Sequence, residues 1–265
     1  MSGTARGREA LGDRVVVIKV GGAAAGDEGI ALDLVAERVE RPEAFVIVHG
    51  GGPLVGEWSK RLGLETRFQD GLRITDATTR DVALAALAGL ANKRLVAALA
   101  ARGVNAVGVS GVDAGLLVVD RAEPTLGFVG RVRAVRPKLI ETLLEGRFVP
   151  VIAPAARDAG GELVNVNADE AAGAIAAGTG ARLLLFVTDV DGVRDRGGRL
   201  ISRLDAAEVE RLRSEGVVSG GMLPKLEACL VAAAEGCTAA IVRATDRDAI
   251  RAVLEGHEAG TVVAA

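Results

Sequence analysis

The sequence predicts an α/β fold built around a mainly parallel β-sheet. Short apolar runs rich in β-branched residues alternate with longer segments of helical periodicity, which is the pattern of successive βαβ units. The chain has 265 residues, of which 49% are hydrophobic and 25% charged, so it can bury a large core. We expect one large α/β domain or two modest lobes, with the division placed near residue 180.

Six apolar runs are predicted to be strands and eight periodic segments to be helices. The predicted strands are 14–20, 44–49, 105–109, 148–152, 182–187 and 238–242. The predicted helices are 28–41, 53–62, 77–101, 137–146, 168–179, 205–215, 221–236 and 246–255. Two further short runs, 115–120 and 127–135, are separated by turn residues and predict a β-hairpin inserted between αβ units.

Composition argues against several classes of protein. A net charge of −3, a pI near 5.6, 2% aromatic residues and no tyrosine are not typical of a nucleic-acid-binding surface. No uninterrupted apolar run approaches the roughly 18 residues of a membrane span, and the polar start of the chain lacks the apolar core of a signal peptide. We therefore expect a cytoplasmic protein with no membrane partner. Cys229 and Cys237 lack metal-site spacing, so we expect both to be reduced thiols.

Lysine is scarce in this chain, which makes its positions informative. Only five of the 32 basic residues are lysines, and two of these, Lys19 and Lys225, lie beside paired glycines. Lys19 stands near the end of an apolar strand, in the stretch VVVIKVGG, where burying an unpaired ammonium group is costly. Either Lys19 reaches solvent at the strand tip or it faces a bound anion. The neighbouring glycines favour the anion.

Four glycine-containing motifs follow predicted strands or begin a predicted helix. They are KVGG (19–22), HGGGP (49–53), TDVDGV (188–193) and SGGMLPK (219–225). In open α/β sheets ligands bind beyond the carboxyl ends of the strands, where glycine N–H groups and helix N-termini suit anions. Neither the Walker A pattern nor the G-x-G-x-x-G spacing is present. Each motif alone could be a turn, but together they predict an anion-binding edge.

Two polar segments add candidate binding residues. In NVNADE, Asn165 and Asn167 alternate on an extended stretch, and Asp169 falls near the start of an alanine-rich helix. Helix capping accounts for one of these three residues, and the others could hold a polar ligand and orient the lysines. In GLRITD, Arg73 could clamp a carboxylate, although an ordinary solvated arginine is the alternative.

Taken in order, the motifs KVGG, HGGGP, GLRITD, NVNAD, TDVDGV and SGGMLPK resemble the amino acid kinase family, and within it the N-acetylglutamate kinases of arginine biosynthesis. The resemblance implies a three-layer αβα sandwich around an open, mainly parallel sheet. It also implies acyl-amino-acid binding and dimerisation in an N-terminal lobe, 1–180, and ATP binding in a C-terminal lobe, 181–265. The implied reaction is ATP-dependent phosphorylation of the γ-carboxylate of N-acetyl-L-glutamate.

The resemblance also implies roles for individual residues. The pair Lys19 and Lys225 would stabilise the transferring phosphoryl group, and Asp169 would position both. The implied contacts to acetylglutamate are Gly51, Gly52, Arg73 and Asn165. The implied contacts to the nucleotide are Gly21, Gly22, Thr188, Asp189 and Gly221. Mg²⁺ would be held mainly by the ATP phosphates, because the sequence has no evident carboxylate cage.

The chemistry of the implied reaction suits these residues. The attacking γ-carboxylate has an ordinary pKa of about 4.3, so it is ionised at neutral pH and needs no general base. Catalysis must then bring two anions together and offset their charge, which lysines and glycine N–H groups can do.

Some positions depart from the family pattern and leave alternatives open. The chain reads GGAAAG after the first lysine, with Val112 where lysine is common and Ala114 where glycine is common. A sister kinase that acts on carrier-protein-linked aminoadipate or glutamate is one alternative, and a non-catalytic amino-acid sensor of the same fold is another. Only 14 residues precede Val15, where the resemblance begins, so we expect a homodimer without strong arginine feedback.

Overall fold

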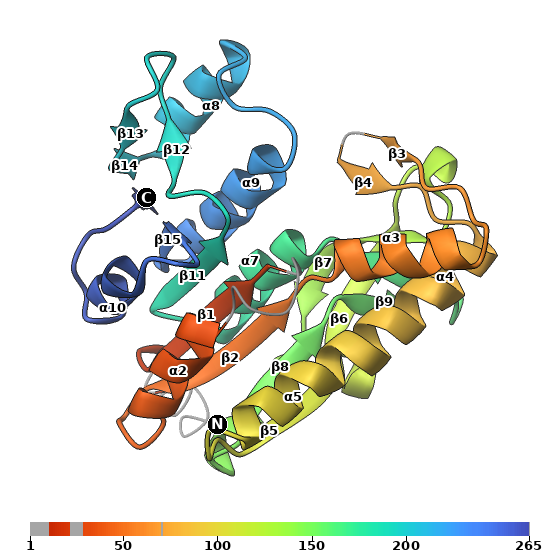
Figure 1. Cartoon of the computed structure of the whole chain (residues 1–265), viewed down its shortest axis with the longest axis horizontal. Coiled ribbons are helices and arrows are strands. Elements are labelled where there is room, and N and C mark those ends of the chain that lie inside the picture. Colours follow the sequence, from red (N-terminus) through yellow and green to blue (C-terminus); the bar gives the residue numbers. More distant parts are fainter. Residues whose placement is uncertain (1–10, 22–28, 70, 265) are drawn as a thin grey trace, which may run out of the picture.

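The computed structural model describes residues 11–21, 29–69 and 71–264 and is organised around one eight-stranded sheet (Figure 1). In sheet order the strands are β14 (Arg203–Leu204), β16 (Thr261–Val263), β15 (Thr238–Arg243), β11 (Leu183–Thr188), β1 (Val15–Val20), β2 (Ala44–His49), β8 (Val149–Ala153) and β5 (Ala106–Ser110). All neighbouring strands are parallel except β15 and β16. The six predicted strands are confirmed to within one residue at each end.

Helices cover both faces of this sheet. They are α2 (Gly29–Arg38), α3 (Gly52–Arg61), α4 (Ala77–Leu84), α5 (Asn92–Ala100), α6 (Lys138–Glu145), α7 (Ala168–Thr179), α8 (Ala206–Ser214), α9 (Met222–Ala233) and α10 (Arg247–Leu254). Alternate residues of β1 join two separate cores: Val15 and Val17 pack on the side of α7 and α9, and Val16 and Ile18 pack on the side of α2, α5 and α10. The predicted three-layer αβα sandwich is confirmed.

The predicted hairpin is confirmed, but it belongs to a larger unit. Strands β6 (Leu117–Arg121) and β7 (Val129–Val135) are antiparallel, and they close into a small barrel with β9 (Ala155–Arg157) and β10 (Leu163–Val166). Two short ribbons complete the fold: β3 (Phe68–Gln69) with β4 (Leu72–Arg73), and β12 (Val193–Arg194) with β13 (Leu200–Ile201). The barrel matters for the site because β10 leads directly into α7.

The predicted helix 77–101 is continuous but not uniformly α-helical. Between α4 and α5 lies a π-helical segment, η1 (Ala85–Ala91). By length and composition alone, Ala77–Ala100 is apolar enough to cross a bilayer, although Lys93 and Arg94 interrupt its apolar residues. Part of this helix packs on α3, β5 and β8, and core helices of globular proteins meet the same criterion. It is therefore weak evidence for a membrane span.

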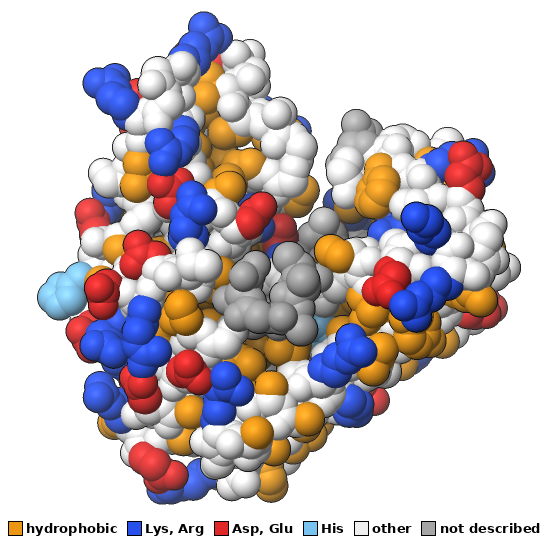
Figure 2. Space-filling model, viewed as in Figure 1, with side chains coloured by type: hydrophobic (Ala, Val, Ile, Leu, Met, Phe, Trp, Pro, Cys, Tyr) orange, Lys and Arg blue, Asp and Glu red, His pale blue; other side chains and the backbone are white. Residues whose placement is uncertain are grey.

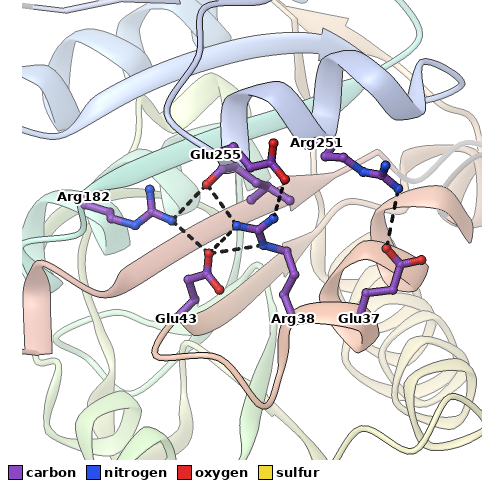
Figure 3. Close-up of polar contacts among 7 residues, drawn as sticks. Glu37, Arg38, Glu43, Arg182, Arg251 and Glu255 are labelled. Carbon is purple, nitrogen blue, oxygen red and sulfur yellow. Dashed lines mark hydrogen bonds and ion pairs between the residues drawn. The ribbon is translucent and has the colours of Figure 1, made fainter.

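At the amino end of the sheet, a partly buried ionic cluster joins α2 to α10 (Figure 3). Arg38 at the end of α2 donates to Glu43 at 2.6 Å and to Glu255 at 3.3 Å, and its side chain is only 6% exposed. Arg182 lies 3.6 Å from the same Glu43 and donates to the Leu254 carbonyl. We call Arg38, Glu43, Arg182 and Glu255 the amino-end cluster. It ties together segments on either side of residue 180.

Ala114 lies in a short 3₁₀ turn after β5. Its φ is 52°, a left-handed value that alanine adopts only at a cost. The carboxylate of Asp113 supports the turn by accepting hydrogen bonds from the N–H and hydroxyl of Ser110. An alanine therefore adopts, in this turn, a backbone conformation that usually favours glycine.

Candidate active site

Three charged side chains from three elements meet beyond the carboxyl ends of the central strands. Lys19, on the β1 face that includes Val17, lies 2.7 Å from one carboxylate oxygen of Asp169. Lys225 in the first turn of α9 donates to the other oxygen at 3.0 Å. One carboxylate thus bridges two ammonium groups. We call Lys19, Asp169 and Lys225 the lysine–aspartate triad, and the structure brings all three predicted residues together.

Local packing explains why α7 and α9 deliver their residues to one point. Asn167 caps α7, and its side chain accepts hydrogen bonds from the N–H groups of Asp169 and Glu170, which fixes the first turn. One turn further along, a Cβ at Gly173 would lie 2.6 Å from the Ala228 carbonyl oxygen. Only glycine lets the helices approach this closely, so Asp169 and Lys225 meet at their N-terminal ends.

The triad is buried and unbalanced in charge. The exposed fractions of its side chains are 11% for Lys19, 12% for Asp169 and 8% for Lys225. Burial lowers the pKa of Lys19, and the ammonium group of Lys225 adds to this effect, while the carboxylates of Asp169 and Asp189 oppose it. Burial alone would raise the pKa of Asp169, but the two lysines together hold it below its ordinary value. Two cations against one anion make the triad a receptor for a further anion.

The four residues predicted to contact an acyl amino acid line one cavity. Gly51, Gly52, Arg73 and Asn165 surround a space of about 150 Å³ that reaches the start of α7. Arg73 donates to the Gly52 carbonyl at 3.1 Å and to the Thr66 hydroxyl, and it lies over the Phe68 ring. Burial lowers the pKa of Arg73. Because these three partners are a carbonyl, a hydroxyl and a ring, none of which carries a charge, the guanidinium remains able to receive a carboxylate.

The residues predicted on the nucleotide side lie around β11 and the start of α9. Thr188 ends β11 and donates to Asp189 at 3.0 Å, and Gly221 immediately precedes α9. Gly21 donates to Val187 of β11, which fixes the chain after Lys19 against the same strand. Gly22 and the departure GGAAAG fall largely outside the described residues. Figure 2 shows this face hollowed between the α9 side and the β3–β4 ribbon.

Two polar side chains beside the glycine turn carried no role in the sequence analysis. His49 and Asn92 are each only 1% exposed, and they hydrogen-bond to each other behind Gly50. The sequence feature that could have indicated a role for His49 is its position immediately before three glycines, in a chain with only two histidines.

The fold and the comparisons with known proteins agree on the class. A family model described as the amino acid kinase family matches residues 14–243, so this chain belongs to that family. An acetylglutamate kinase from Methanopyrus kandleri is 45% identical over 93% of this chain and 99% of its own length. Another, from Jannaschia sp., is 44% identical over 87% of this chain and 82% of its own. A crystal structure of smu.665 from Streptococcus mutans UA159 superposes with a TM-score of 0.80 at 26% identity, covering 95% of this chain and 98% of that one.

Proposed function

We propose that this chain is an ATP-dependent kinase that phosphorylates the γ-carboxylate of N-acetyl-L-glutamate, yielding N-acetyl-L-glutamyl 5-phosphate for arginine biosynthesis. The observation that carries the proposal is the lysine–aspartate triad, in which one carboxylate at 2.7 and 3.0 Å holds two buried ammonium groups. The choice of N-acetylglutamate as the acceptor is supported by the two acetylglutamate kinases, which match this chain over 82–99% of their own length.

On this proposal the triad stabilises the transferring phosphoryl group. Lys19 and Lys225 offset the charge that accumulates as two anions approach, and Asp169 keeps both lysines in place and charged. No proton has to leave the nucleophile, because an acceptor carboxylate with a pKa near about 4.3 is ionised at neutral pH. Asp169 therefore acts by position rather than as a base.

The acceptor would occupy the cavity beside α3. Gly51 and Gly52 lie at the N-terminus of α3, where backbone N–H groups favour a carboxylate oxygen. Arg73 would bind the remaining carboxylate of the acyl amino acid, and Asn165 would bind its polar amide region. This arrangement leaves the γ-carboxylate directed toward the triad.

The nucleotide would occupy the opposite side, over β11 and α9. Thr188, Asp189 and Gly221 would contact ATP there, with Gly21 and Gly22 near its phosphates. Mg²⁺ would arrive on the phosphate oxygens, since the described residues include no group of three or more His, Cys, Asp or Glu side chains placed to hold a metal. We accordingly retain the division into an acceptor lobe, 1–180, and a nucleotide lobe, 181–265, as part of the proposal.

We further propose a cytoplasmic homodimer. A groove on α3 and η1 has an apolar floor with charged residues beside it, and Leu62 within it is 62% exposed; the groove is lined by Leu54, Trp58, Leu62 and Leu90 together with Glu57, Arg61 and Arg94. A second copy of this chain would cover it. Light scattering should report a dimer, and Leu62→Glu should shift it toward a monomer. Both cysteines are buried and free, as suits a reducing compartment.

The direct test is ATP-dependent acyl-phosphate formation, trapped as the hydroxamate, with N-acetylglutamate, free glutamate and carrier-linked aminoadipate offered separately. Turnover on N-acetylglutamate alone is the expected result. Turnover on the carrier-linked substrate alone would move the chain to the sister kinase with its triad intact. No turnover on any acceptor would support the sensor.

A further inference from the structure

His49 is the last residue of β2, and its hydrogen bonds determine which ring nitrogen carries the proton. Its Nδ1 lies 2.8 Å from the Gly50 carbonyl oxygen, which can only accept, so Nδ1 is the protonated nitrogen. Its Nε2 lies 3.2 Å from Asn92 Nδ2, which also donates to the Val151 carbonyl at 2.8 Å. Nε2 is therefore the acceptor and the imidazole is neutral. Burial accordingly lowers the pKa of His49 to about 4.

These bonds fix the orientation of one peptide group. The Gly50 N–H donates to Val20, the residue after Lys19, and the Gly50 carbonyl accepts from His49. In a planar trans peptide the carbonyl of one residue and the N–H of the next point in opposite directions. Since the Gly50 carbonyl points back to the buried imidazole, the Gly51 N–H points away from that imidazole, and Gly51 is one of the residues that line the acceptor cavity.

The π-helical segment η1 packs against the same turn. A Cβ at Gly51 would collide with the Leu87 side chain, so Leu87 contacts the turn directly, and it also lines the acceptor cavity. The Asn92 N–H bonds to the Leu87 carbonyl, five residues back, which places Leu87 and Asn92 one above the other. In a regular α-helix five residues would turn them about 140° apart. The π-helical geometry is what directs both side chains at the turn.

We infer that His49 and Asn92 are positioning residues for the acceptor side of the site, an inference that rests on the proposed function. They hold the Gly50–Gly51 peptide in a fixed orientation. The Gly51 N–H is therefore already oriented for the acceptor carboxylate before the acceptor binds. The η1 segment is the device that presents Asn92 and Leu87 together. Preorganisation of this kind lowers the cost of binding the acceptor and leaves the nucleotide side unaffected.

Two substitutions of His49 separate the two hydrogen bonds. In His49→Asn the side-chain amide can occupy the Nδ1 position and donate to Gly50, whereas in His49→Gln it reaches toward the Nε2 position and leaves Gly50 without its donor. We expect His49→Gln to raise the KM for N-acetylglutamate at least tenfold and the KM for ATP less than threefold. We expect His49→Asn to stay within threefold on both. Lys93→Ala, an exposed neighbour of Asn92, is the matched control.

Contrary results would be clear. Equal KM increases in both His49 variants, or a parallel rise for both substrates together with a lowered Tm, would mean that His49 only fills space. A second measurement does not depend on turnover: ¹⁵N NMR of the wild-type imidazole should show the Nδ1–H tautomer at pH 7, and the Nε2–H tautomer would overturn the inference. If wild type phosphorylates only a carrier-linked acceptor, the proposed function fails, and the same KM ratio on that acceptor still decides the role of His49.

Discussion

The two ends of the central sheet carry ionic clusters of opposite character, a partly buried one at the amino end and a buried one at the carboxyl end. The amino-end cluster has two guanidinium groups and two carboxylates, so its charges balance (Figure 3). The lysine–aspartate triad at the carboxyl end has two ammonium groups and one carboxylate. A balanced cluster has its partners within the fold, whereas the excess positive charge of the triad suits an anionic ligand. Charge balance thus distinguishes a structural cluster from the proposed binding site in the same sheet.

The largest contrast should come from removing one cation of the triad. Lys225→Met should lower kcat about 10³- to 10⁵-fold, as expected when a cation that stabilises a transferring phosphoryl group is lost. The affinity for acetylglutamate, measured by titration calorimetry, should stay within several-fold, and the matched variant Lys138→Met, at an exposed position of α6, should keep full activity. Loss of acetylglutamate binding in Lys225→Met would contradict the role assigned to this lysine.

Removing a cation from the amino-end cluster should affect stability instead. Arg38→Met leaves the buried Glu43 with only the more distant Arg182, and it should lower the free energy of unfolding by about 3–5 kcal/mol. Urea denaturation measures this loss, and kcat of the folded variant should change less than twofold. The exposed pair Arg251–Glu37 supplies the control, because Arg251→Met should cost no more than about 0.5 kcal/mol. A large fall in kcat for Arg38→Met would remove the contrast between the two ends.

Acid should act on the carboxyl end through His49. Burial lowers the pKa of His49 to about 4, below its ordinary 6.5, so on acidification the unfolded chain takes up the proton first. Stability that is present above pH 6.5 should therefore fall by roughly 3 kcal/mol as the pH drops to 4. Urea midpoints across this range measure the slope, which should flatten in His49→Asn. An unchanged slope would show that other groups cause it.

The smallest effect should come from the contact that aligns the helices of the triad. A methyl group in Gly173→Ala would lie 2.6 Å from the Ala228 carbonyl oxygen and push α7 from α9, costing about 1–3 kcal/mol of stability. We expect kcat to fall about tenfold while both KM values change little, because misplacing the reacting groups slows the chemical step. Gly29→Ala in α2, where a Cβ meets only a flexible arginine tip, is the control. Normal kcat in Gly173→Ala would separate helix spacing from catalysis.

Sequence reasoning succeeded where a pattern extends over many residues. The central strands and α7 were predicted almost to the residue, because apolar β-branched runs and an alanine-rich period have distinct boundaries. The short barrel strands β9 and β10 escaped, since three or four residues show too little periodicity. The π-helical segment was also missed, because its sequence AALAGLA suits an α-helix equally well.

The site shows the same limit. Lys19 and Lys225 could be singled out because lysine is rare here, and Asp169 because it begins a helix. The two lysines meet the carboxylate of Asp169 because α7 and α9 pack closely at Gly173, and no local sequence pattern predicts that packing. His49 and Arg38 were missed for a related reason. One histidine before a turn, or one arginine among many, acquires a meaning only from the partners that the fold brings to it.

The pairing of β1 with both β2 and β11 also sets a length scale for the proposed reaction. The acceptor turn leaves β2, the nucleotide loop leaves β11, and only β1 with Lys19 lies between them. Two strand spacings amount to roughly 10 Å, so the roots of the two loops are held about that far apart by backbone hydrogen bonds. The sheet thus sets the separation between the proposed phosphoryl donor and acceptor sites, and Lys19 lies midway between them.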